Sequence, residues 1–239
     1  MLGDFTRQAI YGATRVAVPD HPELQEAVLG EGAVGANEES RTTRGLLELL
    51  RSYDPHAAKL VLRRNCRNTR PVGEETALLS GFDSLPYRLD GHDSLPVDYR
   101  WWRSADSQVE ELRGVLGSLT ADGVRVDDIV VLSPLRYESS VASRLASDPE
   151  HPVVPSGQRA STAIGRAPVV FSTIHAFKGM ESPVVVMCDI ARMSGEDAQT
   201  MLYVGMSRAR SHLIVLLDER LRREVRVAVE RRLTREWAS

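Results

Sequence analysis

The sequence has few cysteines, few aromatic residues and no excess of basic residues. Its two cysteines, Cys66 and Cys188, lie far apart and fit no Cys-x-x-Cys or Cys/His spacing, so neither a disulfide framework nor a metal site is expected. The formal net charge of -3 at pH 7 argues against nucleic-acid binding through bulk positive charge, although a local basic groove stays compatible with it. No apolar run approaches the roughly 18 residues that span a membrane, and the N-terminal residues lack a signal-peptide pattern. We therefore expect a cytoplasmic protein.

A phosphate-binding loop is also missing from the printed sequence. No stretch fits G-x-x-x-x-G-K-S/T, because the glycine-rich stretch at 30–35 continues into Ala-Asn-Glu-Glu. With 42% hydrophobic and 26% charged residues, the 239-residue chain has the composition of a soluble protein with one large or two small domains.

Strand-like and helix-like segments alternate along most of the chain. The predicted strands are 58–63, 97–102, 128–134, 168–171, 183–188 and 211–217. The predicted helices with defined bounds are 22–30, 38–52, 69–79, 137–146, 199–210 and 221–237. A further helix is predicted to begin at Ser104 or Ser107 and to carry an apolar stripe as far as Leu119. Thr69 is predicted to cap the third of these, and the spacing of Ser107 and Glu110 is typical of a capping box. This alternation predicts an α/β fold with a doubly wound parallel sheet.

Polar residues are concentrated in the stretch from Phe171 to Glu181, between two apolar runs, and again in the stretch from Leu202 to Arg210. Open α/β sheets hold ligands at the carboxyl ends of their parallel strands. We therefore interpret the two stretches as one polyanion site at one edge of the sheet.

The two stretches resemble motifs V and VI of UvrD/Rep-like superfamily 1 DNA helicases, which read Thr-x-His-x-x-Lys-Gly-x-Glu and Tyr-Val-x-x-(Ser/Thr)-Arg-Ala. The matching residues are Thr173, His175, Lys178, Gly179, Glu181, Tyr203, Val204, Ser207, Arg208 and Ala209. Motif III of the same helicases resembles a stretch with Gly3, Asp4, Gln8, Ile10 and Tyr11. Motif IV, Asn-Tyr-Arg-Ser-Thr, resembles the stretch 65–69, with Cys66 in place of the usual tyrosine and Asn68 in place of serine.

The resemblance implies a domain organisation and a function. Residues 57–239 would form a RecA-like helicase domain 2A, and residues 1–56 would be a remnant of domain 1A that begins in mid-domain. The chain would be the C-terminal half of an ATP-dependent DNA helicase of repair or recombination, in which ATP hydrolysis drives translocation on single-stranded DNA. Because the loop that holds the nucleotide and the ligands of Mg²⁺ are expected in a missing N-terminal domain or a partner protein, this half would be inactive alone.

The resemblance also implies a nucleotide-contacting set. Arg208, Arg67 and Gln8 would contact the γ-phosphate of ATP, and charge stabilisation of this kind is most of what phosphoryl transfer requires. Glu181 would accept a hydrogen bond from the ribose, and Gly179 would let the backbone approach the nucleotide.

Structural roles stay open for several of these residues. Arg208 could instead cap the helix before it or pair with Glu181 or Glu196, and Glu181 could pair with Lys178 or cap the following element. We interpret Arg210 as a surface charge.

Single-stranded DNA would meet Thr173, His175 and Tyr11, the first two through the phosphate backbone. A lone histidine is more often a satisfied core residue, so that alternative stays open for His175. The tryptophans could also stack on bases, but aromatic side chains are more often core residues, and only Tyr11 is predicted as a site.

A second interpretation comes from another class of protein. The chain could be a non-catalytic module that docks on a separate ATPase or nuclease subunit and uses its helicase-like face as an interface.

Overall fold

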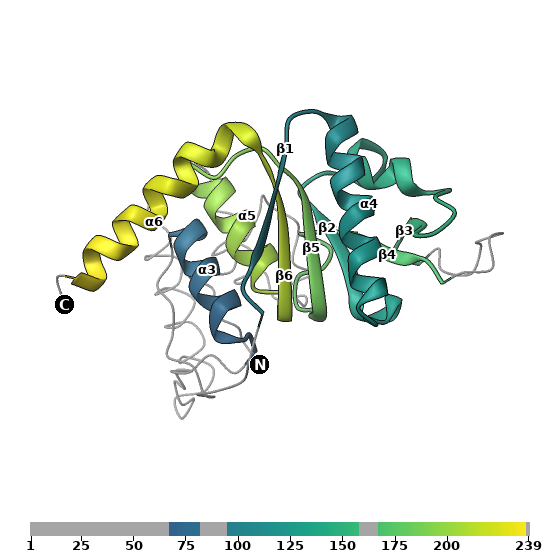
Figure 1. Cartoon of the computed structure of the whole chain (residues 1–239), viewed down its shortest axis with the longest axis horizontal. Helices are drawn as coiled ribbons and strands as arrows, with labels where there is room; N and C mark the ends of the chain where they lie inside the picture. Colours follow the sequence, from purple (N-terminus) through teal and green to yellow (C-terminus); the bar gives the residue numbers. More distant parts are fainter. Residues whose placement is uncertain (1–66, 82–94, 158–166, 238–239) are drawn as a thin grey trace, which may run out of the picture. The chain divides into compact units, whose positions relative to one another are not determined.

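The structure, a computed structural model, describes residues 67–81, 95–157 and 167–237 (Figure 1). Six strands form one sheet in the order β1-β6-β5-β2-β4-β3, and every neighbouring pair is parallel. The strands are β1 (Asp98–Trp102), β2 (Ile129–Ser133), β3 (Val153–Pro155), β4 (Val169–Thr173), β5 (Ser182–Ile190) and β6 (Ala209–Asp218). The α-helices are α3 (Arg70–Ser80), α4 (Ala105–Ala121), α5 (Glu196–Met206) and α6 (Arg222–Trp237). The predicted α/β fold with a parallel sheet and flanking helices is thereby confirmed.

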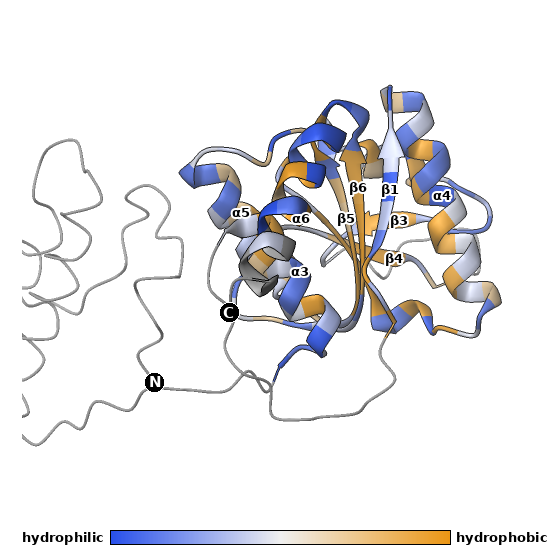
Figure 2. Ribbon diagram, turned by 60° about the vertical axis from the view of Figure 1, so that its left-hand side comes forward, coloured by the Kyte–Doolittle hydropathy of each residue, from blue (hydrophilic) through white to orange (hydrophobic). Residues whose placement is uncertain are grey.

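Helices cover both faces of the sheet. Figure 1 places α4 over one face, and α3, α5 and α6 lie on the other. Because both faces are covered, the central strands have no solvent side, and they read as continuous apolar runs rather than alternating ones. Every residue of β2 is buried. Figure 2 shows the same division: the strands in the middle are hydrophobic, and the outer surfaces of the helices are hydrophilic.

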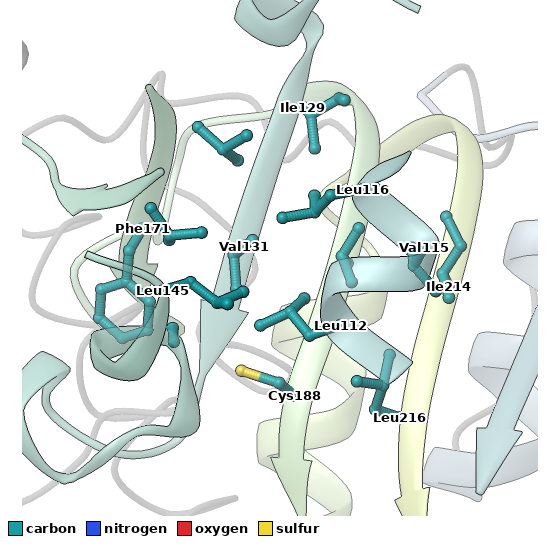
Figure 3. Packing of buried hydrophobic residues seen from close by; sticks show 14 of the residues in the cluster. Leu112, Val115, Leu116, Ile129, Val131, Leu145, Phe171, Cys188, Ile214 and Leu216 are labelled. Carbon is teal, nitrogen blue, oxygen red and sulfur yellow. The ribbon is translucent and has the colours of Figure 1, made fainter. Parts of the chain in front are cut away.

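The core on the α4 side is built from one stripe of that helix and the residues beneath it. Figure 3 shows Leu112 and Leu116 of α4 packed over Val131 of β2, with Ile214 and Leu216 of β6 beside them. The predicted stripe from Val109 to Leu119 is thus the buried face of the helix.

The helix α4 begins one position after Ser104. The Ser104 hydroxyl accepts a hydrogen bond from the Ser107 amide at 3.2 Å, and the Ser107 hydroxyl accepts one from the Ser104 amide at 3.0 Å. This reciprocal pair is a capping box. The predicted box at Ser107 and Glu110 was therefore wrong, because Ser107 is already its third helical position.

Two other local predictions differ from the structure. The segment 137–146 is not an α-helix but two 3-10 helices, η2 (Tyr137–Ser139) and η3 (Val141–Leu145). Ser140 separates them, and its hydroxyl donates a 2.6 Å hydrogen bond to Asp189 at the far end of β5. Thr69 precedes α3 but makes no side-chain cap; its hydroxyl donates to the Ser211 carbonyl at 3.5 Å instead.

Several predictions concern residues outside the described ranges. They are the strand at 58–63, the helices at 22–30 and 38–52, and the domain boundary between residues 56 and 57. Within the described residues, no helix combines the length and the apolar character that crossing a membrane would require.

Candidate functional site

Three charged residues from three separate segments meet at the amino-terminal edge of the sheet. Arg67 lies just before α3, Glu181 directly before β5, and Arg208 directly before β6. The Nε atom of Arg67 is 3.5 Å from Oε2 of Glu181, and both residues are about half exposed, at 46% and 45%. Arg208 lies close enough to both for their charges to affect its pKa. The predicted convergence of these three residues is therefore present in the structure.

Arg208 is a buried cation, with only 8% of its surface exposed. Its Nε atom donates to the Val204 carbonyl at 2.9 Å, Nη1 to the Met180 carbonyl at 3.4 Å, and Nη2 to the Ser207 hydroxyl at 2.8 Å. Burial and then the neighbouring charge of Arg67 lower the pKa of Arg208 to about 10. The hydrogen bond to the Val204 carbonyl fits the alternative in which Arg208 caps the end of α5. Burial and the charge of Arg67 nevertheless disfavour the charged form of the Arg208 guanidinium group.

Asn68 joins the two arginine-bearing segments. Its side-chain amide donates to the Ser207 carbonyl at 3.1 Å and also to the Ala209 carbonyl, the two carbonyls on either side of Arg208. The next residue continues the pairing, because the Thr69 amide donates to the Arg210 carbonyl at 3.0 Å. These bonds hold Arg67 beside Arg208 although the two charges repel each other.

The segment between β4 and β5 runs from one edge of the sheet to the other. Strand β4 ends at Thr173, which pairs with Ser133, the last residue of β2, and therefore lies at the carboxyl edge of the sheet. Strand β5 begins at Ser182, close to the first residues of β2, and therefore at the amino edge. At about 3.3 Å per residue the two levels are about 20 Å apart along the strands. Ile174 and Phe177 of the connecting segment are buried.

The expected single polar edge is therefore wrong. Thr173 lies at the carboxyl edge and Glu181 at the amino edge, with the segment 174–181 between them. The physical reason is the parallel pairing of the strands that flank the motif, because a chain that leaves one parallel strand must return before it can start the next. His175 is exposed, which excludes its alternative role as a core residue.

Sequence comparison identifies the part of the chain that carries the two polar stretches. The family model of the UvrD-like helicase C-terminal domain matches residues 168–216. The resemblance of the two polar stretches to UvrD/Rep-like helicases is thereby confirmed.

Two further comparisons accompany the family match. The C-terminal domain of a possible DNA helicase from Lactobacillus plantarum WCFS1 has a TM-score of 0.48 and 16% sequence identity, over 64% of this chain and 88% of that chain. No curated protein matches the chain.

Within the UvrD-like segment, the remaining predicted site residue is Gly179. It is exposed and has a left-handed backbone with φ of 87°, a conformation that residues with a Cβ atom rarely adopt. A Cβ atom added there would meet nothing within 4 Å, so its backbone conformation, and not crowding, favours glycine at this position. Gln8 and Tyr11 lie outside the described residues, and their roles stay predictions.

Sequence reasoning missed a polar cluster at the carboxyl edge. Asp189 has a left-handed backbone, with φ of 60°, and its carboxylate accepts hydrogen bonds from the hydroxyls of Ser133 and Ser140, both at 2.6 Å. The neighbouring thiol of Cys188 is completely buried, and this burial raises its pKa. No sequence pattern joins these residues, because the two serines lie about fifty positions before Asp189.

Arg210 is a surface charge, as predicted, but it also takes part in the cluster, because its Nε atom lies 3.6 Å from Oε1 of Glu181. The sequence could have indicated this contact, since Arg210 follows the motif arginine by only two residues and so lies near the same end of β6.

Proposed function

We propose that this chain supplies the C-terminal, arginine-bearing side of an ATP-dependent DNA helicase, which couples ATP hydrolysis to movement along single-stranded DNA. One observation carries the proposal: Arg67, Glu181 and Arg208 come from three separate segments and converge at one edge of the sheet. A structural ion pair would need only two of them, whereas several guanidinium groups aimed at one place suit phosphate oxygens.

The residues present fit the phosphates of a nucleotide. Arginines are planar forks that match phosphate geometry, and the like charges of Arg67 and Arg208 oppose each other until an anion lies between them. Within the described residues, no group of His, Cys, Asp or Glu side chains could hold a metal ion. The printed sequence contains no phosphate-binding loop, so this loop and the ligands of Mg²⁺ that accompany it are expected from another unit, in the same polypeptide or a separate one.

In this proposal the two arginines stabilise charge on the γ-phosphate when ATP is bound by the other unit. Such an arginine is worth about 10³ to 10⁵ in turnover in phosphohydrolases in which it has been measured. Glu181 accepts a hydrogen bond from the ribose, and Gly179 allows the backbone to approach. At the carboxyl edge, Thr173 and His175 contact the phosphates of single-stranded DNA, which position the strand without reading its sequence.

The test is DNA-stimulated ATP hydrolysis by the protein together with its phosphate-loop unit. The coding sequence directly upstream identifies this unit, if it encodes G-x-x-x-x-G-K-S/T. We expect Arg208→Lys to lower turnover at least about 100-fold while single-stranded DNA affinity changes less than about threefold, because lysine keeps the charge but not the fork.

The control is Arg144→Lys, the same substitution at an arginine outside the cluster: Arg144 lies in η3 and pairs with Asp106 at 2.7 Å. This variant should hydrolyse ATP at the wild-type rate. Unchanged turnover in Arg208→Lys would reject the assignment. Such a result would favour the other interpretation, a non-catalytic module that docks on an ATPase or nuclease subunit.

A further inference from the structure

Arg210 has no role in the proposed function, yet it belongs to the same cluster. One carboxylate, that of Glu181, lies between two guanidinium groups: Oε2 is 3.5 Å from Nε of Arg67, and Oε1 is 3.6 Å from Nε of Arg210. Charge-assisted hydrogen bonds are shorter, at about 2.7–2.9 Å. The two contacts are therefore loose ion pairs that an incoming anion can replace at little cost.

The cluster keeps an excess of positive charge. Arg67, Arg208 and Arg210 lie around the carboxylate of Glu181, so these four groups together carry a net charge of +2. Arg67 and Arg210 are 46% and 56% exposed, so an anion in solution can reach them. Arg208 is buried behind them and holds its charge against burial.

We propose that Arg210 is a third cation of the phosphate-binding cluster, and that Glu181 is a resident counter-ion that a polyphosphate displaces. The inference rests on the proposed function. Without nucleotide, Glu181 partly neutralises Arg67 and Arg210 and keeps their side chains together. A polyphosphate carries more negative charge than one carboxylate and replaces it. The displaced carboxylate then accepts a hydrogen bond elsewhere on the nucleotide.

The experiment measures binding of inorganic tripolyphosphate to the full chain by calorimetry at low salt. Tripolyphosphate lacks the ribose, so any ribose contact of Glu181 is excluded from the result. Arg210→Ala should weaken binding about 3- to 10-fold, because it removes one charged phosphate contact. Glu181→Gln should tighten binding about 2- to 5-fold, because it removes the carboxylate that competes with the phosphate, and exposed ion pairs contribute free energies of about this size. Both effects should shrink at high salt.

The pair Arg144 and Asp106 provides matched controls, because it is an ion pair between a half-exposed arginine of η3 and an exposed aspartate of α4. Arg144→Ala and Asp106→Asn change the net charge of the protein by the same amounts as the two test variants. Effects of Arg210→Ala and Glu181→Gln beyond those of the controls support the inference. Effects equal to the controls, or weaker binding by Glu181→Gln, overturn it.

Two more variants separate this inference from the proposed function. If Arg67→Ala and Arg208→Lys weaken tripolyphosphate binding while Arg210→Ala does not, only the role of Arg210 is wrong. If none of the three arginine variants weakens binding, the phosphate site itself is wrong, and both proposals are rejected together.

Discussion

At the scale of single residues, the cost of burying Arg208 is the feature that most favours function over structure. Its pKa falls from the usual value of arginine to about 10, which corresponds to about 3 kcal/mol against the charged form at about 1.4 kcal/mol per pKa unit. Below about pH 10 the folded protein carries this full cost. Above about pH 10 the folded state releases a proton that the unfolded state still binds, so the contribution of Arg208 to stability rises from there to the usual pKa of arginine.

A substitution by an apolar residue of similar length should therefore cost little stability. Arg208→Met removes the buried charge but also leaves the carbonyls of Val204 and Met180 without their donor, at about 1 kcal/mol each. We expect the free energy of unfolding in urea at neutral pH to stay within about 1 kcal/mol of the wild type, while tripolyphosphate binding is lost. A loss of about 3 kcal/mol or more would instead show that Arg208 acts mainly as the cap of α5.

What the sequence could predict about single residues depended on whether a motif carried them. The convergence of Arg67, Glu181 and Arg208 followed from three motif matches, although the residues lie far apart in the chain. The burial of Arg208 did not follow, because arginine is usually exposed, and the carbonyls of Val204 and Met180 that receive its hydrogen bonds come from two separate segments. The contact between Arg210 and Glu181 was missed for a different reason: it depends on the pairing of β5 with β6, which places the starts of the two strands side by side.

At the scale of elements, the position of Arg208 depends on how closely α5 approaches the sheet. Gly205 is the contact point: a Cβ atom there would lie 2.6 Å from Cε of Met187 on β5 and 3.2 Å from Cδ1 of Ile174. Met187 is completely buried and Ile174 almost so, and their neighbours limit how far either side chain can move. Gly205 thus sets the spacing between α5 and β5, three residues before Arg208.

We expect Gly205→Ala to destabilise the protein by about 1–3 kcal/mol, the usual cost of overpacking a core. Gly114→Ala is the control, because Gly114 is an exposed position inside α4 with nothing within 4 Å of an added Cβ. That variant should gain about 0.5–1 kcal/mol from helix propensity alone. Urea unfolding measures both, and Met187→Leu should restore part of the loss. A Gly205→Ala protein as stable as Gly114→Ala would contradict the close packing.

Elements were predictable where their own residues determine them. The strands β2, β5 and β6 are continuous apolar runs because both faces of the sheet are covered, and the pattern alone indicated them. The segment 137–146 was different. Its sequence suits an α-helix, but the hydroxyl of Ser140 binds Asp189 and the Ala142 amide, which breaks the segment into two 3-10 helices. A contact with a residue about fifty positions away cannot be read from a local pattern.

At the scale of the whole described domain, the two proposed sites lie at opposite edges of one sheet. The arginine cluster is at the amino edge, and Thr173 and His175 are at the carboxyl edge, about 20 Å away at about 3.3 Å per residue. The segment 174–181 is the direct covalent link between them, and Ile174 and Phe177 anchor it in the core. Any coupling between nucleotide and DNA within this chain therefore has to pass through packed core residues and not through direct charge interaction.

The two edges should consequently be separable by mutation in the chain alone. Charges further apart than about 8 Å are largely screened at physiological salt, so a variant at one edge should barely change the field at the other. We expect His175→Ala to weaken binding of a single-stranded oligonucleotide at least about threefold and to change tripolyphosphate affinity less than about twofold. Arg67→Ala should do the reverse, measured by fluorescence anisotropy and calorimetry on the same preparations. Because each variant removes a half-exposed or exposed side chain, neither should alter the fold. If either variant weakens both ligands equally, the two ligands share one site, and the assignment of DNA to the carboxyl edge is wrong.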